Sequence, residues 1–372
     1  MRRVVWQCWR ALLGAAALLP AGLSAQSGLR TRHVILMTID GVRGQEFFRG
    51  MDSVIAASGD SSGIYDLARL KRDFWRSSPG ERRRVLMPFF WDSLAPRGIV
   101  YGNRALGSAA SITNGQGFSA PGYQEILTGQ AQADVTSNDP VRYRHLTVLE
   151  YVRRRLRLAE SQVAAITSWE NFRYYVASDS AAVFVNAGYV PIPPTLATPR
   201  LRYLERLQQR GLALWEGSRL DVFTGAIALE YLKSRKPTLL YISFNDTDDL
   251  AHSRRYDRLL DAFHATDDFL RELWQAIQAT PELKGRTTLI LTTDHGRGFR
   301  SSDWDDHGKE VPGSEQIWAA VIGPDTPAAG EARNLPEVHQ ADIAATILEL
   351  LGLAPADFNP AAGPPLPGAV RH

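Results

Sequence analysis

The chain has 372 residues, of which 44% are hydrophobic and 22% are charged, and its 42 basic and 40 acidic side chains give a formal net charge of +2. This apolar fraction and low net charge exclude a disordered or collagen-like chain, because such chains lack the apolar surface to build a core. The length allows one large α/β domain or two smaller ones, and the near-neutral charge gives no support to a nucleic-acid-binding module.

The first 25 residues have the pattern of an export signal. Arg2 and Arg3 form a short basic region, and residues 11–19 form an apolar stretch that falls short of the roughly 20 residues a membrane span requires. We therefore expect residues 1–25 to be a signal peptide, with no membrane span after its removal and a periplasmic or secreted location. Its removal also takes away Cys8, the only cysteine, and leaves 39 basic against 40 acidic residues.

Short apolar runs alternate with longer helical patterns along the rest of the chain. Alternation of this kind predicts an α/β fold with a central, mostly parallel sheet sandwiched by helices. In such sheets, ligands bind beyond the carboxyl ends of the strands. The strands are expected at residues 33–39, 162–167, 238–244, 287–292 and 317–322, and the main helices at 223–233, 254–277 and 340–351.

One domain with insertions is the simplest organisation, because the chain has no internal repeat and no clear composition boundary. We expect this domain to cover residues 26–353. Residues 69–84 are rich in Arg and Lys and predict a solvated helix or excursion. Residues 354–372 contain five prolines and predict a loosely ordered tail.

Acidic and histidine side chains follow three of the predicted strands, and a further histidine precedes the last strand. Because the carboxyl ends of parallel strands meet at one edge of a sheet, these side chains are expected to converge. Mixed oxygen and nitrogen ligands without a thiolate suit zinc in a catalytic, incompletely closed site. The predicted ligands are Asp40, Asp248, His252, Asp294, His295 and His307.

Each of these residues also has a purely structural explanation. Asp40 precedes a glycine and suits a turn, and Asp248 and His252 at i and i+4 suit a solvated helix face. His307 competes with His339 for the last ligand position. We choose His307 because it precedes the strand at 317–322, whereas His339 opens the final helix. The joint pattern favours a metal centre over independent turn residues.

The ordered set of motifs resembles the alkaline phosphatase superfamily. Over residues 34–353 it is most similar to the type I phosphodiesterase/nucleotide pyrophosphatase-like branch, to which the sulfatases are more distantly related. The motifs that carry the resemblance are Ile39-Asp40-Gly41, Ser119-Ala120-Pro121-Gly122-Tyr123 running to Thr128-Gly129, Asp248-x3-His252, Asp294-His295-Gly296 and His307.

The resemblance implies an alkaline phosphatase-like, metal-dependent hydrolase of phosphoric ester bonds that acts on a small phosphate ester. It implies two zinc ions, with other divalent metals as alternatives. Ser119 would be the metal-bound nucleophile and would form a phosphoseryl intermediate, and Asn138 would contact a phosphoryl oxygen, with Asn114 and Asn103 as competitors. One zinc would be held by Asp40, Asp294 and His295, and the other by Asp248, His252 and His307.

Two departures from the family pattern bear on the substrate. Sulfatases mature the Cys or Ser of a Cys/Ser-x-Pro-x-Arg motif to formylglycine, and Tyr123 stands here in place of the arginine. The Lys/Arg pair that some monoesterases add corresponds to residues 168–171, where Arg173 is the only nearby cation. The first departure argues against a sulfatase of that type, and the second favours a diester or other singly charged substrate, with a monoester as the close alternative. We therefore expect an exported phosphoesterase for diesters or monoesters. The alternatives are a sulfatase, phosphonate hydrolase or mutase of the same superfamily, or an inert metal-binding module.

Overall fold

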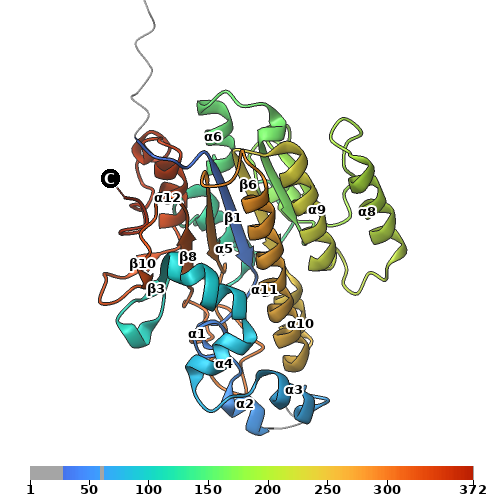
Figure 1. Ribbon diagram of the computed structural model, residues 1–372, viewed down its shortest axis with the longest axis vertical. Helices are drawn as coiled ribbons and strands as arrows, with labels where there is room; N and C mark the ends of the chain where they lie inside the picture. Colours follow the sequence, from blue (N-terminus) through green and yellow to red (C-terminus); the bar gives the residue numbers. More distant parts are fainter. Residues whose placement is uncertain (1–27, 59–62, 372) are drawn as a thin grey trace, which may run out of the picture.

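The computed structural model describes residues 28–58 and 63–371. The predicted signal peptide, residues 1–25, lies outside the described residues. Helices cover both faces of a central sheet, and four short helices within residues 44–86 gather at one end of it (Figure 1). This arrangement confirms the predicted α/β class. In the part of the chain that the structure describes, no helix combines the length and apolar character needed to cross a membrane.

The main sheet has eight strands among the described residues, in the order β5-β4-β6-β1-β7-β8-β2-β9. The first five are parallel, and all five predicted runs form strands. The strands are β1 (His33–Ile39), β2 (Gly98–Tyr101), β4 (Val163–Thr167), β5 (Phe184–Ala187), β6 (Leu239–Phe244), β7 (Thr287–Thr292), β8 (Ala319–Ile322) and β9 (Gly330–Glu331), and β3 (Ala110–Ser111) pairs with β10 (Val338–His339) in a second sheet.

The strand β8 runs antiparallel to both β7 and β2. Parallel neighbours need a crossover connection, which is usually a helix. The chain between β7 and β8 contains no helix, so it returns in the opposite direction. This long loop, residues 293–318, carries Asp294, His295 and His307.

Side chains of β1 alternate between two apolar clusters, one on each face of the sheet. Ile35, Met37 and Ile39 pack on one face, and Val34 and Leu36 on the other. Alternation follows from the period of two in a strand, and burial on both faces explains why the run is continuously apolar. The first face is covered by α9 (Asp221–Arg235) and α11 (Tyr256–Ala279), and the second by α5 (Ser119–Thr128), α6 (Val148–Arg155) and α12 (Asp342–Leu350).

The Arg- and Lys-rich segment 69–84 covers most of two short helices and the four residues between them. Ser78 begins the second helix with a capping box that includes Glu81, which explains the break between the two. Arg82 is buried in spite of the solvated character that its neighbours predict. The four helices at this end are α1 (Gly44–Arg49), α2 (Ser53–Ser58), α3 (Leu67–Phe74) and α4 (Pro79–Leu86). The remaining α-helices in the described part of the chain are α7 (Phe172–Tyr175), α8 (Pro199–Arg210) and α10 (Asp246–His252).

The prediction of a loosely ordered tail at residues 354–372 is wrong for its described part. Leu366 and Val370 are buried in the apolar cluster around α12. The Tyr101 hydroxyl donates to the Pro367 carbonyl at 2.9 Å, and the Arg371 amide donates to the Asp325 carbonyl at 2.8 Å. Prolines exclude regular strands and helices, but they also reduce the entropy lost on ordering and so permit packing of an irregular segment.

Truncation of the tail side chain Leu366 tests this packing. Because Leu366 is buried, Leu366→Ala is expected to lower the free energy of unfolding by about 2–5 kcal/mol. The matched control Leu212→Ala removes a side chain that is 81% exposed and should change it by less than about 0.5 kcal/mol. Urea unfolding of both variants measures the difference, and equal effects would mean that the tail is loosely ordered after all.

Candidate metal centre

The predicted ligands emerge from three adjacent strands of the sheet. Asp40 directly follows β1, Asp294 and His295 follow β7, and α10 follows β6 and carries Asp248 and His252. These strands are parallel and lie in the order β6-β1-β7, so their carboxyl ends share one edge. The sheet therefore brings side chains together that are more than 200 residues apart in sequence.

The short helix α10 holds its two ligands on one face because its first turn is anchored. The Asp221 carboxylate accepts hydrogen bonds from the backbone amides of Asn245 at 2.8 Å and Asp246 at 3.0 Å. Amides at a helix N-terminus have no partner within the helix, and a side-chain oxygen satisfies them. The helix then places Asp248 and His252 at i and i+4, as predicted.

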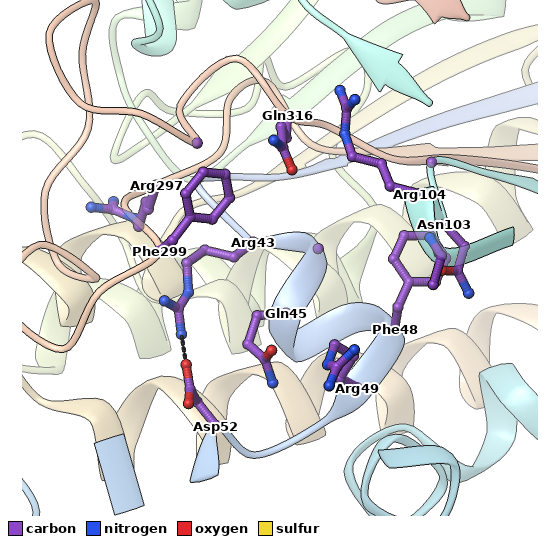
Figure 2. A pocket seen from close by; sticks show the side chains of 14 residues that line it. Arg43, Gln45, Phe48, Arg49, Asp52, Asn103, Arg104, Arg297, Phe299 and Gln316 are labelled. Carbon is purple, nitrogen blue, oxygen red and sulfur yellow. Dashed lines mark hydrogen bonds and ion pairs between the residues drawn. The ribbon is translucent and has the colours of Figure 1, made fainter. Parts of the chain in front are cut away.

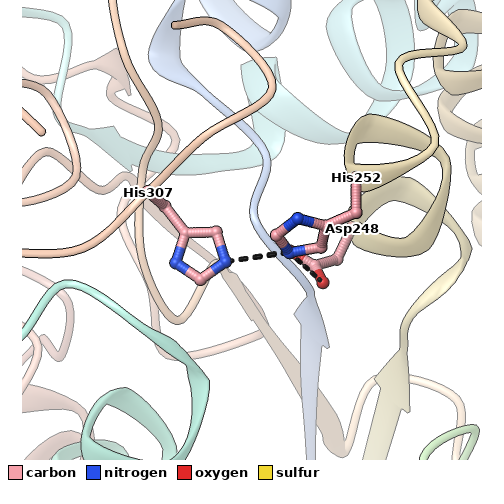
Figure 3. A group of neighbouring side chains, drawn as sticks. All are labelled: Asp248, His252 and His307. Carbon is pink, nitrogen blue, oxygen red and sulfur yellow. Dashed lines mark hydrogen bonds and ion pairs between the residues drawn. The ribbon is translucent and has the colours of Figure 1, made fainter.

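The outer cluster consists of Asp248, His252 and His307 (Figure 3). The His307 Nε2 lies 3.0 Å from the His252 Nε2 and 3.8 Å from the Asp248 Oδ1. The His252 Nε2 lies 3.3 Å from the Asp248 Oδ2. These three side chains each offer one ligand atom within 4.8 Å of the others. His307 belongs to this cluster and His339 does not. His339 lies in β10, the short strand before α12.

The ring of His307 is oriented by a backbone carbonyl. Its Nδ1 lies 3.2 Å from the Gly117 carbonyl oxygen, which can only accept a hydrogen bond, so Nδ1 carries the proton. Burial lowers the pKa of His307, and the charges of His295 and Arg297 lower it further. A neutral ring with a free Nε2 is the form of histidine that binds a metal ion.

The inner cluster consists of Asp40, Asp294 and His295, all of which are buried. The His295 Nε2 lies 3.4 Å from both the Asp40 Oδ1 and the Asp294 Oδ2. Its Nδ1 donates to the Gly296 carbonyl at 2.8 Å, which leaves Nε2 for a ligand. Asp40, Asp248 and His295 each offer one ligand atom within 4.8 Å of the others, a group that includes Asp248 in place of Asp294. The Asp248 Oδ1 lies 4.0 Å from the His295 Nε2. Asp248 therefore lies between the two clusters.

One oxygen of each inner carboxylate has no hydrogen-bond partner. These atoms are the Asp40 Oδ1 and the Asp294 Oδ2, both buried and both facing the His295 Nε2. Burial and the charge of Asp40 raise the pKa of Asp294 well above its usual value. Burial lowers the pKa of His295, but the charges of Asp294 and Asp40 raise it to about 9. Unsatisfied buried oxygens are costly, and a divalent cation would satisfy them. The donor set therefore fits a metal ion.

Ser119 lies beside the inner cluster. It is the first residue of α5, and its Oγ lies 3.5 Å from the His295 Nε2. The Asn138 Oδ1 accepts a hydrogen bond from the Ala120 amide at 2.9 Å, so this side chain is next to Ser119.

The two competing asparagines use their side chains elsewhere. The Asn114 amide group binds Glu125 and the backbone of its own turn. The Asn103 side chain binds Glu331 and the Ala105 amide. Among the three candidates, only Asn138 contacts the helix turn that begins with Ser119.

Arg297 is a further residue of this region that the sequence analysis did not identify. Its guanidinium is buried, forms an ion pair with Asp248 and donates to the carbonyls of Gly41 at 3.1 Å and Asp305 at 2.7 Å. A Cβ at Gly41 would lie 2.8 Å from the Arg297 Nε, so only glycine fits there. The available signal was its position directly after the Asp294-His295-Gly296 motif.

Arg297 also lines a cavity of about 300 Å³ next to α1 (Figure 2). Four arginines and one aspartate line this cavity, and Arg43 forms an ion pair with Asp52 at 3.2 Å. None of the predicted metal ligands lines it, and neither do Ser119 or Asn138. The cavity therefore borders the candidate centre through Arg297 without being part of it.

Removal of one outer ligand is expected to lower the metal content. His307→Ala deletes one of three side chains that face a common point, so zinc bound to the purified protein should fall relative to wild type after dialysis. His145→Ala is the matched control, because that ring pairs with Asp134 outside both clusters. Elemental analysis measures both, and an unchanged zinc content in His307→Ala would contradict the assignment.

Metal removal is expected to destabilise the fold. A ligand that binds only the folded state at a hundredfold excess over its Kd stabilises by about 2.7 kcal/mol. Treatment with a chelator should therefore lower the Tm of the wild-type protein, and added zinc should restore it. Calorimetry measures the shift. A Tm that responds to neither treatment would mean that the buried carboxylates are neutralised by protons alone.

Comparison with known proteins supports the predicted class of enzyme. Residues 159–309 match the family described as type I phosphodiesterase / nucleotide pyrophosphatase, a family of phosphoric-ester hydrolases, which is the predicted class of enzyme. No curated protein matches the chain.

Solved structures with the same fold include two enzymes and one putative enzyme. A phosphonate monoester hydrolase from Silicibacter pomeroyi is 11% identical over 90% of this chain and 78% of its own, with a TM-score of 0.53. One from Agrobacterium radiobacter is 13% identical over 90% and 78%, with a TM-score of 0.51. A putative sulfatase from Bacteroides thetaiotaomicron is 12% identical over 88% and 73%, with a TM-score of 0.53. Residues 159–309 are therefore similar to the type I phosphodiesterase / nucleotide pyrophosphatase family, and the chain shares its fold with these hydrolases.

Proposed function

We propose that the protein is an exported, zinc-dependent phosphoesterase in which Ser119 is the nucleophile. One observation carries this proposal: the Ser119 Oγ lies 3.5 Å from the His295 Nε2, beside two buried carboxylates that each keep an unsatisfied oxygen. A hydroxyl beside a cation site matches the requirement of phosphoryl transfer for an activated nucleophile. The exported location rests on the sequence pattern of residues 1–25.

Two zinc ions would occupy the inner and outer clusters, the first held by Asp40, Asp294 and His295 and the second by Asp248, His252 and His307. Bound there, they would lower the pKa of the Ser119 hydroxyl and offset the negative charge of the phosphoryl oxygens. The mixed oxygen and nitrogen donor set, without thiolate, supports zinc as the metal.

Ser119 would attack phosphorus in the first step. The Oγ–P bond forms, the bond from phosphorus to the ester oxygen breaks, the serine proton passes to solvent and the departing alcohol gains a proton. Water then attacks the phosphoseryl group, which releases the phosphate product and restores the hydroxyl. As the first residue of the ten-residue helix α5, Ser119 also places the phosphoryl group at the positive end of the helix dipole.

Asn138 would hold one phosphoryl oxygen. Its Oδ1 is fixed by the Ala120 amide, so its Nδ2 is left as a donor beside Ser119. The backbone carbonyl of Asn138 accepts hydrogen bonds from the Asn171 side chain and the Tyr175 hydroxyl, both at 2.9 Å. These bonds restrict the loop that carries Asn138. A preorganised donor of this kind stabilises charge that develops in the transition state.

The segment after β4 favours a substrate of low charge. Ser168 and Asn171, which stand where some monoesterases carry a basic pair, bind Asp221 and Asn138 instead. A singly charged diester needs fewer cations than a doubly charged monoester. The folds shared with phosphonate hydrolases and a putative sulfatase support the second candidate, another phosphoryl- or sulfuryl-transfer enzyme of the superfamily.

Replacement of the nucleophile tests the proposal. Ser119→Ala should lower the turnover of a bis-aryl or aryl phosphate by several orders of magnitude and keep the zinc content, because the ligands are untouched. Ser77→Ala removes an exposed serine outside the site and should leave turnover unchanged. Spectrophotometric rates and elemental analysis give the two readouts.

The outcomes separate the candidates. Activity retained in Ser119→Ala would mean that another group is the nucleophile. Turnover of an aryl sulfate alone would favour the sulfuryl-transfer candidate. No turnover of any of the three aryl esters by a zinc-loaded wild-type protein would favour an inert metal-binding module.

A further inference from the structure

We propose that Tyr123 is a positioning residue that makes Asp40 a single-oxygen metal ligand and ties it to the helix of the candidate nucleophile. The inference rests on the proposed function and deepens it. Its main observation is a hydrogen bond of 2.6 Å from the Tyr123 hydroxyl to the Asp40 Oδ2. Both side chains are buried, so water does not compete for either atom.

The hydrogen bond divides the two oxygens of Asp40 between two tasks. The Oδ2 is occupied by Tyr123, and the Oδ1 has no hydrogen-bond partner and faces the His295 Nε2 at 3.4 Å. A free carboxylate can rotate and bind a cation through either oxygen or both. With Tyr123 in place, only the Oδ1 is available at the inner cluster.

Tyr123 also links this ligand to Ser119. The two residues are four apart in α5, so they project from the same face of the helix. One side chain reaches Asp40 and the other reaches the His295 Nε2. Between them, Gly122 lies against the Asp294 backbone so closely that a Cβ would collide with the Asp294 carbonyl oxygen. Helix, nucleophile and ligand are therefore held in one arrangement.

Aromatic packing fixes the side chain of Tyr123. Its ring packs edge-on against Phe172, with the ring centroids 4.5 Å apart. The hydroxyl is therefore held in place to donate to the Asp40 Oδ2. The sulfatase motif has an arginine at the position of Tyr123, whereas Tyr123 here donates a hydrogen bond to the predicted ligand Asp40.

The test is Tyr123→Phe in the full-length protein, which removes the hydroxyl and keeps the ring packing. Loss of a group that orients a metal ligand lowers metal affinity by about 10–100-fold. We expect a loss of this size in zinc affinity, measured by competition with a chromophoric chelator. We also expect a lower kcat with a nearly unchanged KM, because the substrate contacts remain.

Tyr231→Phe is the matched control. Its hydroxyl is also in a buried part of the chain and donates to the Ser161 carbonyl at 3.0 Å, but it makes no contact with either cluster. This variant should keep the zinc affinity and kcat of wild type. Equal melting temperatures of the two variants, both measured after metal removal, would show that general stability does not explain a difference in zinc binding.

Three outcomes would overturn the inference. They are a zinc affinity of Tyr123→Phe within twofold of wild type, an equal loss of affinity in Tyr231→Phe, and a Tyr123→Phe variant that does not fold, since the hydroxyl would then serve the fold. Zinc affinity is measured in the absence of substrate, so it does not depend on catalytic activity. A wild-type protein that binds zinc but hydrolyses no phosphate ester would therefore contradict the proposed function and leave the role of Tyr123 intact.

Discussion

The parallel alignment of β6, β1 and β7 is the constraint on which the candidate site depends. Ile39 pairs with Phe244, and Thr38 pairs with both Ser243 and Thr292, so the three strands end level with one another. The Asp40 amide still donates to the Phe244 carbonyl at 3.0 Å, which extends the pairing to the first ligand. Because the strands are buried on both faces, their register is fixed by packing, and the ligand positions follow from it.

The protein provides a hydrogen-bond partner for one oxygen of each inner carboxylate and none for the other. The Tyr123 hydroxyl takes the Asp40 Oδ2, and the Gly41 amide takes the Asp294 Oδ1 at 3.0 Å. The remaining oxygens, Asp40 Oδ1 and Asp294 Oδ2, both face His295. Buried like charges repel one another strongly at low dielectric constant. Burial of these two carboxylates therefore costs free energy when no positive ion is present. A cation bound between them would offset that cost.

The sequence predicts those parts of the fold and site that depend on local patterns. The strand at residues 33–39 could be placed because a buried strand is a continuous apolar run, and His307 could be chosen from its place before a strand. Tyr123 and Arg297 could not be assigned, because their roles arise from contacts with Asp40 and Asp248 that lie 83 and 49 residues away. The packed tail was missed for the same reason, since Leu366 is buried only by elements distant in sequence.

Anomalous X-ray diffraction at the zinc edge, from crystals grown with zinc, tests the central claim most directly. Two peaks about 4 Å apart are expected, the spacing of two-metal hydrolytic sites. One peak should lie among Asp40, Asp294 and His295, and the other among Asp248, His252 and His307. A single peak, or peaks away from these side chains, would contradict the two-metal centre and the mechanism built on it.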